Sequence, residues 1–170
     1  MYDRLIVDNT QPLLTNLLAF NKIETADMYS KWNQPVERDR WEMSAATVNA
    51  YYHPFKNIIV FPAAILQAPF YSLKQSSSAN YGGIGAVIAH EISHAFDNNG
   101  SLFDEYGNLN NWWTDEDSKQ FKNRAQQMID QFDGIEFAGQ KVNGKLTVSE
   151  NIADAGGLSC ALEAAKSEAD

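Results

Sequence analysis

The segment His90-Glu91-Ile92-Ser93-His94 constrains this chain more than any other five residues. Residues four apart on an α-helix project from one face about one turn apart, so both imidazoles can reach a single metal ion. Glu91 follows the first histidine, where its carboxylate can hold and deprotonate a water on that metal. The spacing is that of zinc hydrolases with two ligands on one helix. The alternative is a chance match between ordinary core or surface histidines.

The residues before this segment predict the kind of helix that carries it. The run from Tyr81 to Ala89 is almost wholly apolar or small, which is typical of a helix buried on all sides. We expect this zinc helix to span about residues 81–97, before the helix-stopping sequence Asp97-Asn98-Asn99-Gly100. The run is shorter than the ~20 residues that cross a bilayer, so it predicts no membrane span. Its glycines lack the complete dinucleotide-binding fingerprint, so that interpretation is not supported.

A catalytic zinc needs three protein ligands, and the third must come from another part of the chain. Glu150 is the best candidate, and Asp154 lies four residues later on the same helical face. One carboxylate can bind the metal while the other orients a ligand histidine. The alternative is that Thr147 and Glu150 form a capping box at a helix start. Gly156 and Gly157 follow inside this helix, where each glycine destabilises the helix by about 1 kcal/mol relative to alanine. Glycines at such a cost are expected where another helix or a ligand approaches closely.

Several ordered motifs together resemble a known family. HEISHAFDNNG, followed after a spacer by ENIADAGG, is similar to the neprilysin family of zinc endopeptidases, which includes the bacterial oligopeptidases O. The stretches NAYY, IVFPAAIL, NYGGIG and NWW match that family too. A thermolysin-like enzyme would share the zinc ligands, but NAYY and NYGGIG argue against it.

The resemblance implies a role for each site residue. One Zn²⁺ per chain is expected, with the ligands His90, His94 and Glu150. Glu91 is the implied catalytic base, and Asp154 and Asp97 are implied to support the zinc site from behind the ligands. Asn49 and Ala50 are implied to hold the backbone of a peptide substrate.

The resemblance also implies the fold and its extent. It predicts an α+β, mainly α-helical, zincin-like (thermolysin-like) catalytic domain with a small sheet, truncated so that residues 1–170 form part of it. The third-ligand helix is expected at about residues 149–168. Relatives are longer, with a helical domain that roofs the active site and, beyond the position of Asp170, a histidine and an arginine that assist catalysis. The expected function is therefore hydrolysis of small to medium peptides; the alternative is a zinc-binding fragment without activity, lacking those parent domains.

Composition sets limits on partners and location. A net charge of −9 argues against nucleic-acid binding. Cys160 is the only cysteine, so no intramolecular disulfide can form, which favours a reducing compartment, namely a bacterial cytoplasm. An extracellular or cell-surface parent stays open. Next to Ala161 and Leu162, the thiol is expected to be buried.

The remaining segments read as scaffold. Residues of about 10–32 predict an amphipathic helix, and residues 47–52 and 57–61 predict strands. Pro62 confines the second of these to a strand end or a sheet edge. An edge strand near zinc can bind an extended peptide as an added strand. Thr114 and the apolar spacing after it predict a capped helix. Asn143-Gly144 predicts the turn of a tight hairpin.

Overall fold

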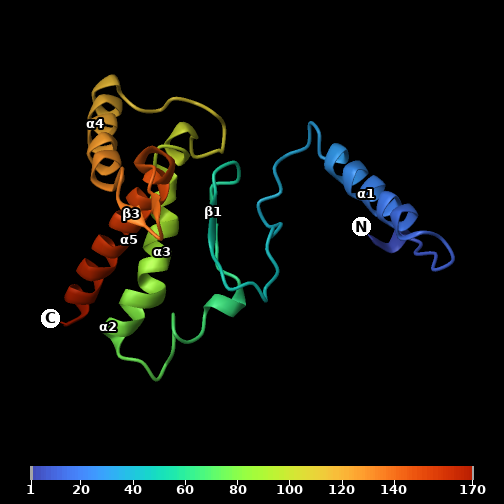
Figure 1. Cartoon of the computed structure of the whole chain (residues 1–170), viewed down its shortest axis with the longest axis horizontal. Helices are drawn as coiled ribbons and strands as arrows, with labels where there is room; N and C mark the ends of the chain where they lie inside the picture. The colour runs from blue at the N-terminus through green and yellow to red at the C-terminus, as the bar shows by residue number, and fades with distance from the viewer. Residues whose placement is uncertain (1, 170) are drawn as a thin grey trace. The chain divides into compact units, whose positions relative to one another are not determined.

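The structure, a computed structural model, describes residues 2–169 (Figure 1). The chain divides into two compact units, one up to Glu37 and one from Arg38 onward. The first unit holds a short 3₁₀ helix, η1 (Tyr2–Arg4), and α1 (Leu13–Ser30). A helix is therefore present where one was predicted, but its apolar side chains do not form the single face of an amphipathic helix. The Tyr2 ring stacks on Phe20 with centroids 5.5 Å apart. No side chain of α1 is buried in this chain, and its four leucines are exposed.

The second unit opens with a two-stranded antiparallel sheet. Strand β1 (Tyr51–His53) pairs with β2 (Ile58–Val60), with Tyr52 opposite Ile59. Both predicted strands are present, although each is shorter than expected. A 3₁₀ turn, η2 (Ala63–Ile65), follows Pro62, and Ile65 forms an apolar cluster with Ala50 and Ile84. This cluster joins the sheet to the helix that carries the histidines.

The histidine-bearing helix is continuous but changes pitch. It begins as α2 (Ser77–Asn80), passes through a π-helical turn η3 (Tyr81–Gly85), becomes α3 (Ala86–Ser93) and ends as a 3₁₀ turn η4 (His94–Phe96). The Ser76 hydroxyl caps it by accepting a hydrogen bond from the Ala79 amide. The prediction of burial on all sides is wrong, because Ile88 and Ile92 are 37% and 47% exposed. One stripe of α3, at Ile88 and Ile92, is left uncovered within the described part of the chain, whereas its other side chains are at least half-buried.

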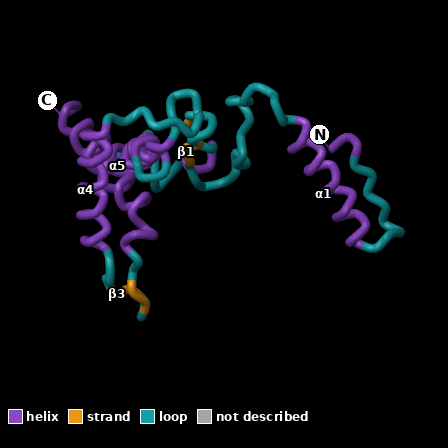
Figure 2. Tube along the Cα trace, turned by 90° about the horizontal axis from the view of Figure 1, so that it is seen from above, coloured by secondary structure: helices purple, strands orange, loops and turns teal. Residues whose placement is uncertain are grey.

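A second pair of helices follows the loop after η4, which contains the short 3₁₀ turn η5 (Gly100–Leu102). Helix α4 (Asp115–Phe132) starts at Thr114, whose hydroxyl accepts a hydrogen bond from the Asp117 amide, as predicted. Its apolar stripe is half-buried (Phe121, Ala125, Met128, Ile129 and Phe132). Helix α5 (Gly144–Ala169) packs on both α3 and α4, and α4 lies beside it in both views (Figures 1 and 2).

The predicted hairpin at Asn143-Gly144 is wrong. The hairpin lies earlier, with β3 (Glu136–Phe137) and β4 (Gln140–Lys141) joined through Ala138 and Gly139, which both have positive φ. Gly144 instead begins α5, where an added Cβ would lie 2.2 Å from the Ile129 carbonyl oxygen. The Asn143 side chain accepts a hydrogen bond from the Leu146 amide and so caps the helix. The glycine serves close helix packing rather than a turn.

The fold is thus mainly helical with small sheets, as the family resemblance implies. Among residues 2–169, no helix is both long and apolar enough to span a bilayer. Cys160 is exposed, contrary to expectation, because no other element among residues 2–169 covers the surface of α5 on which it lies.

We predict that the contact between α3 and α5 tolerates no side chain at Gly157. An added Cβ would lie 2.8 Å from both the Ala86 oxygen and the His90 nitrogen, and backbone atoms cannot rotate away. Gly157→Ala should therefore lower the free energy of unfolding by about 1–3 kcal/mol, measured by denaturant titration of the intact protein. Gly82→Ala is the matched control, since its Cβ meets nothing within 4 Å. Equal stability of the two variants would contradict the prediction.

Candidate metal centre

Three side chains from two helices converge on one point. The Nε2 atoms of His90 and His94 lie 2.9 Å apart, and Glu150 Oε2 lies 3.5 Å and 3.6 Å from them. The histidines come from successive turns of the α3–η4 segment, and Glu150 comes from the second turn of α5. Because α5 already begins at residue 144, Glu150 is not a helix-capping residue. The structure brings together the three residues that the sequence predicts as ligands.

Each imidazole is oriented by a carboxylate on its far side. His90 Nδ1 lies 2.8 Å from Asp154 Oδ1, and His94 Nδ1 lies 2.7 Å from Asp97 Oδ2. A proton held at each Nδ1 by its carboxylate leaves each Nε2 with a free lone pair. Two such lone pairs facing each other repel unless a proton or a cation lies between them. The arrangement therefore favours a cation at the centre of the cluster.

The three donor atoms fit a zinc ion in size as well as in type. A circle through atoms with these separations has a radius of about 1.9 Å, against Zn–N and Zn–O distances of about 2.0–2.2 Å. Two imidazoles and one carboxylate are a ligand set of catalytic zinc sites, which keep a further position open. The Glu150 side chain is 66% exposed, so the cluster is accessible to solvent from its side.

Glu91 is the buried acid of the site. It is 6% exposed, and its carboxylate accepts a hydrogen bond from the Tyr52 backbone amide of β1. Burial raises the pKa of the Glu91 carboxyl above its ordinary value, although the charges of His90 and His94 and the Tyr52 amide act in the opposite direction. A carboxylate with a raised pKa is better suited to accept a proton near neutral pH.

The predicted substrate-binding residues border the same cavity. A hollow of about 420 Å³ is lined by Asn49, Ala50 and Tyr51 on one side and by the histidines, Glu91 and Glu150 on the other. Asn49 is exposed, whereas Ala50 is 6% exposed. His53, the third histidine, lies at the end of β1, where its Nε2 is 3.0 Å from Glu42 Oε1. It takes no part in the cluster.

Asp97 is the most buried acid near the cluster, with 2% exposure. Burial acts to raise the pKa of its carboxyl, but hydrogen bonds from His94, Ser149 and two backbone amides outweigh it and hold the pKa below the ordinary value. Ser149 could not be found from the sequence, because a serine 52 residues from its partner forms no recognisable motif. The amide of Tyr52 was missed for the same reason.

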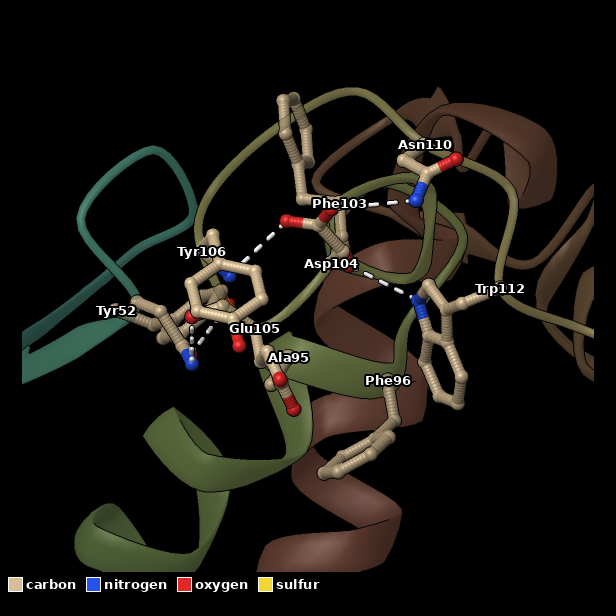
Figure 3. A pocket seen from close by; sticks show the side chains of 10 residues that line it. Tyr52, Ala95, Phe96, Phe103, Asp104, Glu105, Tyr106, Asn110 and Trp112 are labelled. Atoms are coloured by element: carbon tan, nitrogen blue, oxygen red, sulfur yellow. Dashed lines mark hydrogen bonds between the residues drawn. The ribbon is translucent and has the colours of Figure 1, made fainter.

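A second cavity, of about 410 Å³, lies beside the end of η4 (Figure 3). Asp104 lies in its wall and accepts hydrogen bonds from the amides of Tyr106 and Asn108 and from the Asn110 side chain. The indole of Trp112 donates to the Phe103 carbonyl oxygen at 2.9 Å. The carboxylate thus holds its own loop in shape.

Comparison with known proteins gives one family. The model of peptidase family M13 matches residues 49–170. A candidate zinc metalloproteinase of Streptococcus gordonii is 65% identical over 169 residues, which are 99% of this chain and 30% of that protein. The neutral endopeptidase of Lactococcus lactis is 60% identical over 158 residues, 93% of this chain and 25% of its own length. The chain therefore spans between a quarter and a third of these relatives.

Solved structures agree with the sequence matches. The crystal structure of PepO from Lactobacillus rhamnosus superimposes with a TM-score of 0.89 at 52% identity, over 96% of this chain and 26% of that one. A Mycobacterium tuberculosis zinc metalloprotease in complex with an inhibitor gives a TM-score of 0.85 at 44% identity, over 92% of this chain and 25% of that one.

We predict that zinc affinity falls at mildly acidic pH. The hydrogen bond to Asp97 raises the pKa of His94; burial opposes this, and the charges of Glu150, Asp97 and Glu91 reinforce it. Zinc binds the neutral imidazole, so affinity is complete above this raised pKa and declines as the pH falls through it. A chelator-competition titration of the intact protein from about pH 8 to about pH 6 measures the decline. Asp97→Asn should move the decline to lower pH; an affinity independent of pH would contradict the prediction.

Proposed function

Because the chain belongs to peptidase family M13, we propose that the protein carrying it is a zinc-dependent endopeptidase acting on small to medium peptides. The observation that carries the proposal is the convergence of His90, His94 and Glu150 on one point, with Glu91 in the same cavity. The names of the relatives, a candidate zinc metalloproteinase and neutral endopeptidases, support it.

The residues divide into those that hold the metal and those that act on the substrate. His90, His94 and Glu150 would hold Zn²⁺, one ion per chain, with Asp154 and Asp97 fixing the two imidazoles. When bound, the zinc would supply a Lewis acid that makes water more acidic and polarises the scissile carbonyl. The residues around it set where that chemistry takes place.

Glu91 would be the base. It lies one residue after His90 and lines the metal cavity, so its carboxylate is placed to accept a proton from the attacking water and later pass it to the leaving amine. Its burial and raised pKa support this role, since the protonated form is a useful acid in the second step. The Tyr52 amide orients it.

Strand β1 would position the peptide. Within the described part of the chain it pairs only with β2, so its other edge faces away from that sheet. Tyr52, in this strand, lies close enough to Glu91 for its backbone amide to lower the pKa of that carboxyl. The stretch just before the strand, Asn49 and Ala50, is therefore the proposed place for the substrate backbone, bound by the exposed Asn49 side chain and by main-chain groups. Such contacts recognise the backbone and tolerate many side chains.

We predict that Glu91→Gln in the intact protein keeps zinc but loses activity. Glutamine has nearly the same size and cannot accept the proton, so peptide cleavage should fall by at least about 100-fold. Zinc content by atomic absorption should be unchanged. Glu163→Gln, at an exposed position of α5, is the matched control and should retain full activity. Cleavage by Glu91→Gln at the control's rate would refute the base assignment.

We predict that His90→Ala, unlike Glu91→Gln, loses the zinc ion itself. Removal of one of three protein ligands leaves too few donors for stable zinc binding, so both zinc content and cleavage should fall. Zinc stoichiometry and cleavage are measured on the same samples. A wild-type protein that binds zinc without any turnover would identify the alternative, a zinc-binding protein without catalysis.

A further inference from the structure

The two oxygens of the Asp97 carboxylate have different partners. Oδ1 accepts hydrogen bonds from the backbone amides of Asn99 and Gly100, both at 2.7 Å. These bonds fix the carboxylate to its own loop. Oδ2 accepts from His94 Nδ1 at 2.7 Å and from the Ser149 hydroxyl. One buried oxygen therefore joins a histidine of the metal site to helix α5.

The contact between Ser149 and Asp97 lies next to the proposed zinc ligand of α5. Ser149 directly precedes Glu150, the residue of α5 that reaches the two histidines. Its hydroxyl oxygen also accepts a hydrogen bond from Asn99 Nδ2 at 3.2 Å, which leaves the hydroxyl proton directed at Asp97. Glu150 itself is 66% exposed, so burial does not hold its side chain in place. What holds it must act through the neighbouring backbone.

We propose that Ser149 is a positioning residue, which through Asp97 keeps the Glu150 carboxylate in register with the His94 imidazole. The inference rests on the proposed zinc site and adds a residue to it. Helix α5 is attached to both histidines, directly from Asp154 to His90 and through Asp97 from Ser149 to His94. The two attachments flank Glu150, so loss of one lets this end of α5 turn away from the metal.

The competing explanation is that the hydroxyl only satisfies a buried charge. In that case its removal would lower the stability of the metal-free protein and leave the metal site unchanged. A positioning role instead predicts a faster loss of zinc from protein that is still folded. The two explanations therefore differ in a quantity that requires no turnover.

The test compares Ser149→Ala with Ser159→Ala in the intact protein. Ser159 is an exposed serine on the same helix, so its removal controls for the loss of a hydroxyl from α5. Zinc dissociation into an excess of chelator should be about 10-fold faster in Ser149→Ala, the lower end of the effect of residues that support metal ligands, and unchanged in Ser159→Ala. Ser149→Thr keeps the hydroxyl and should restore the slow rate. Thermal unfolding of the metal-free forms reports stability separately.

Two results would overturn the inference. If zinc leaves Ser149→Ala at the same rate as Ser159→Ala, Ser149 is not a positioning residue, although the proposed zinc site still stands. If the wild-type protein binds no zinc, the proposed function is overturned as well. Should Ser149→Ala not fold, Asn99→Ala takes its place, because it removes the bond that orients the serine but keeps the Asn99 backbone amide. It should also release zinc faster, and an unchanged rate would overturn the proposal.

Discussion

The metal site depends on how closely α5 approaches α3. Gly157 lies against the backbone of Ala86 and His90 at a distance that leaves no room for a Cβ, and Gly156 lies against the Ser93 side chain. Contact between two backbones brings the axes of helices nearer than larger residues permit. At this separation a glutamate less than two turns before the glycines can reach imidazoles on the facing helix. A glycine pair that is unfavourable for helix formation thus becomes necessary for helix packing.

Around that contact the charges are arranged to favour a divalent cation. The cavity and its borders contain four acids and only two histidines as basic groups (Glu91, Asp97, Glu150 and Asp154, with His90 and His94). Two acids lie behind the imidazoles, so they strengthen the basicity of the ligand nitrogens without binding the metal. Glu150 faces the centre, and Glu91 is withdrawn into the protein. Carboxylates are therefore placed as the proposed ligand, supports and base according to their burial and partners.

Several features could be predicted because they depend on neighbours in sequence. The start of α4 at Thr114 and its half-buried stripe follow from capping chemistry and helical spacing, and the strands β1 and β2, though not their pairing, follow from β-branched and aromatic runs. Three predictions failed because they depended on what covers a segment. The Asn143-Gly144 pair looked like a turn but supplies a cap and a close packing contact. Cys160, Ile88 and Ile92 are apolar, yet no element in the described part of the chain covers them.

The sequence by itself determined the one-sided display of His90 and His94, since four residues span about one helical turn wherever the helix lies. With the family resemblance it also named Glu150, Asp154 and Asp97. Only the tertiary structure decided that one Asp97 oxygen binds its own loop while the other binds both His94 and Ser149. It also decided that the backbone amide of Tyr52 lies against Glu91. The physical reason is that hydrogen bonds between residues some 40 to 50 positions apart are set by helix and strand packing, for which local spacing holds no information.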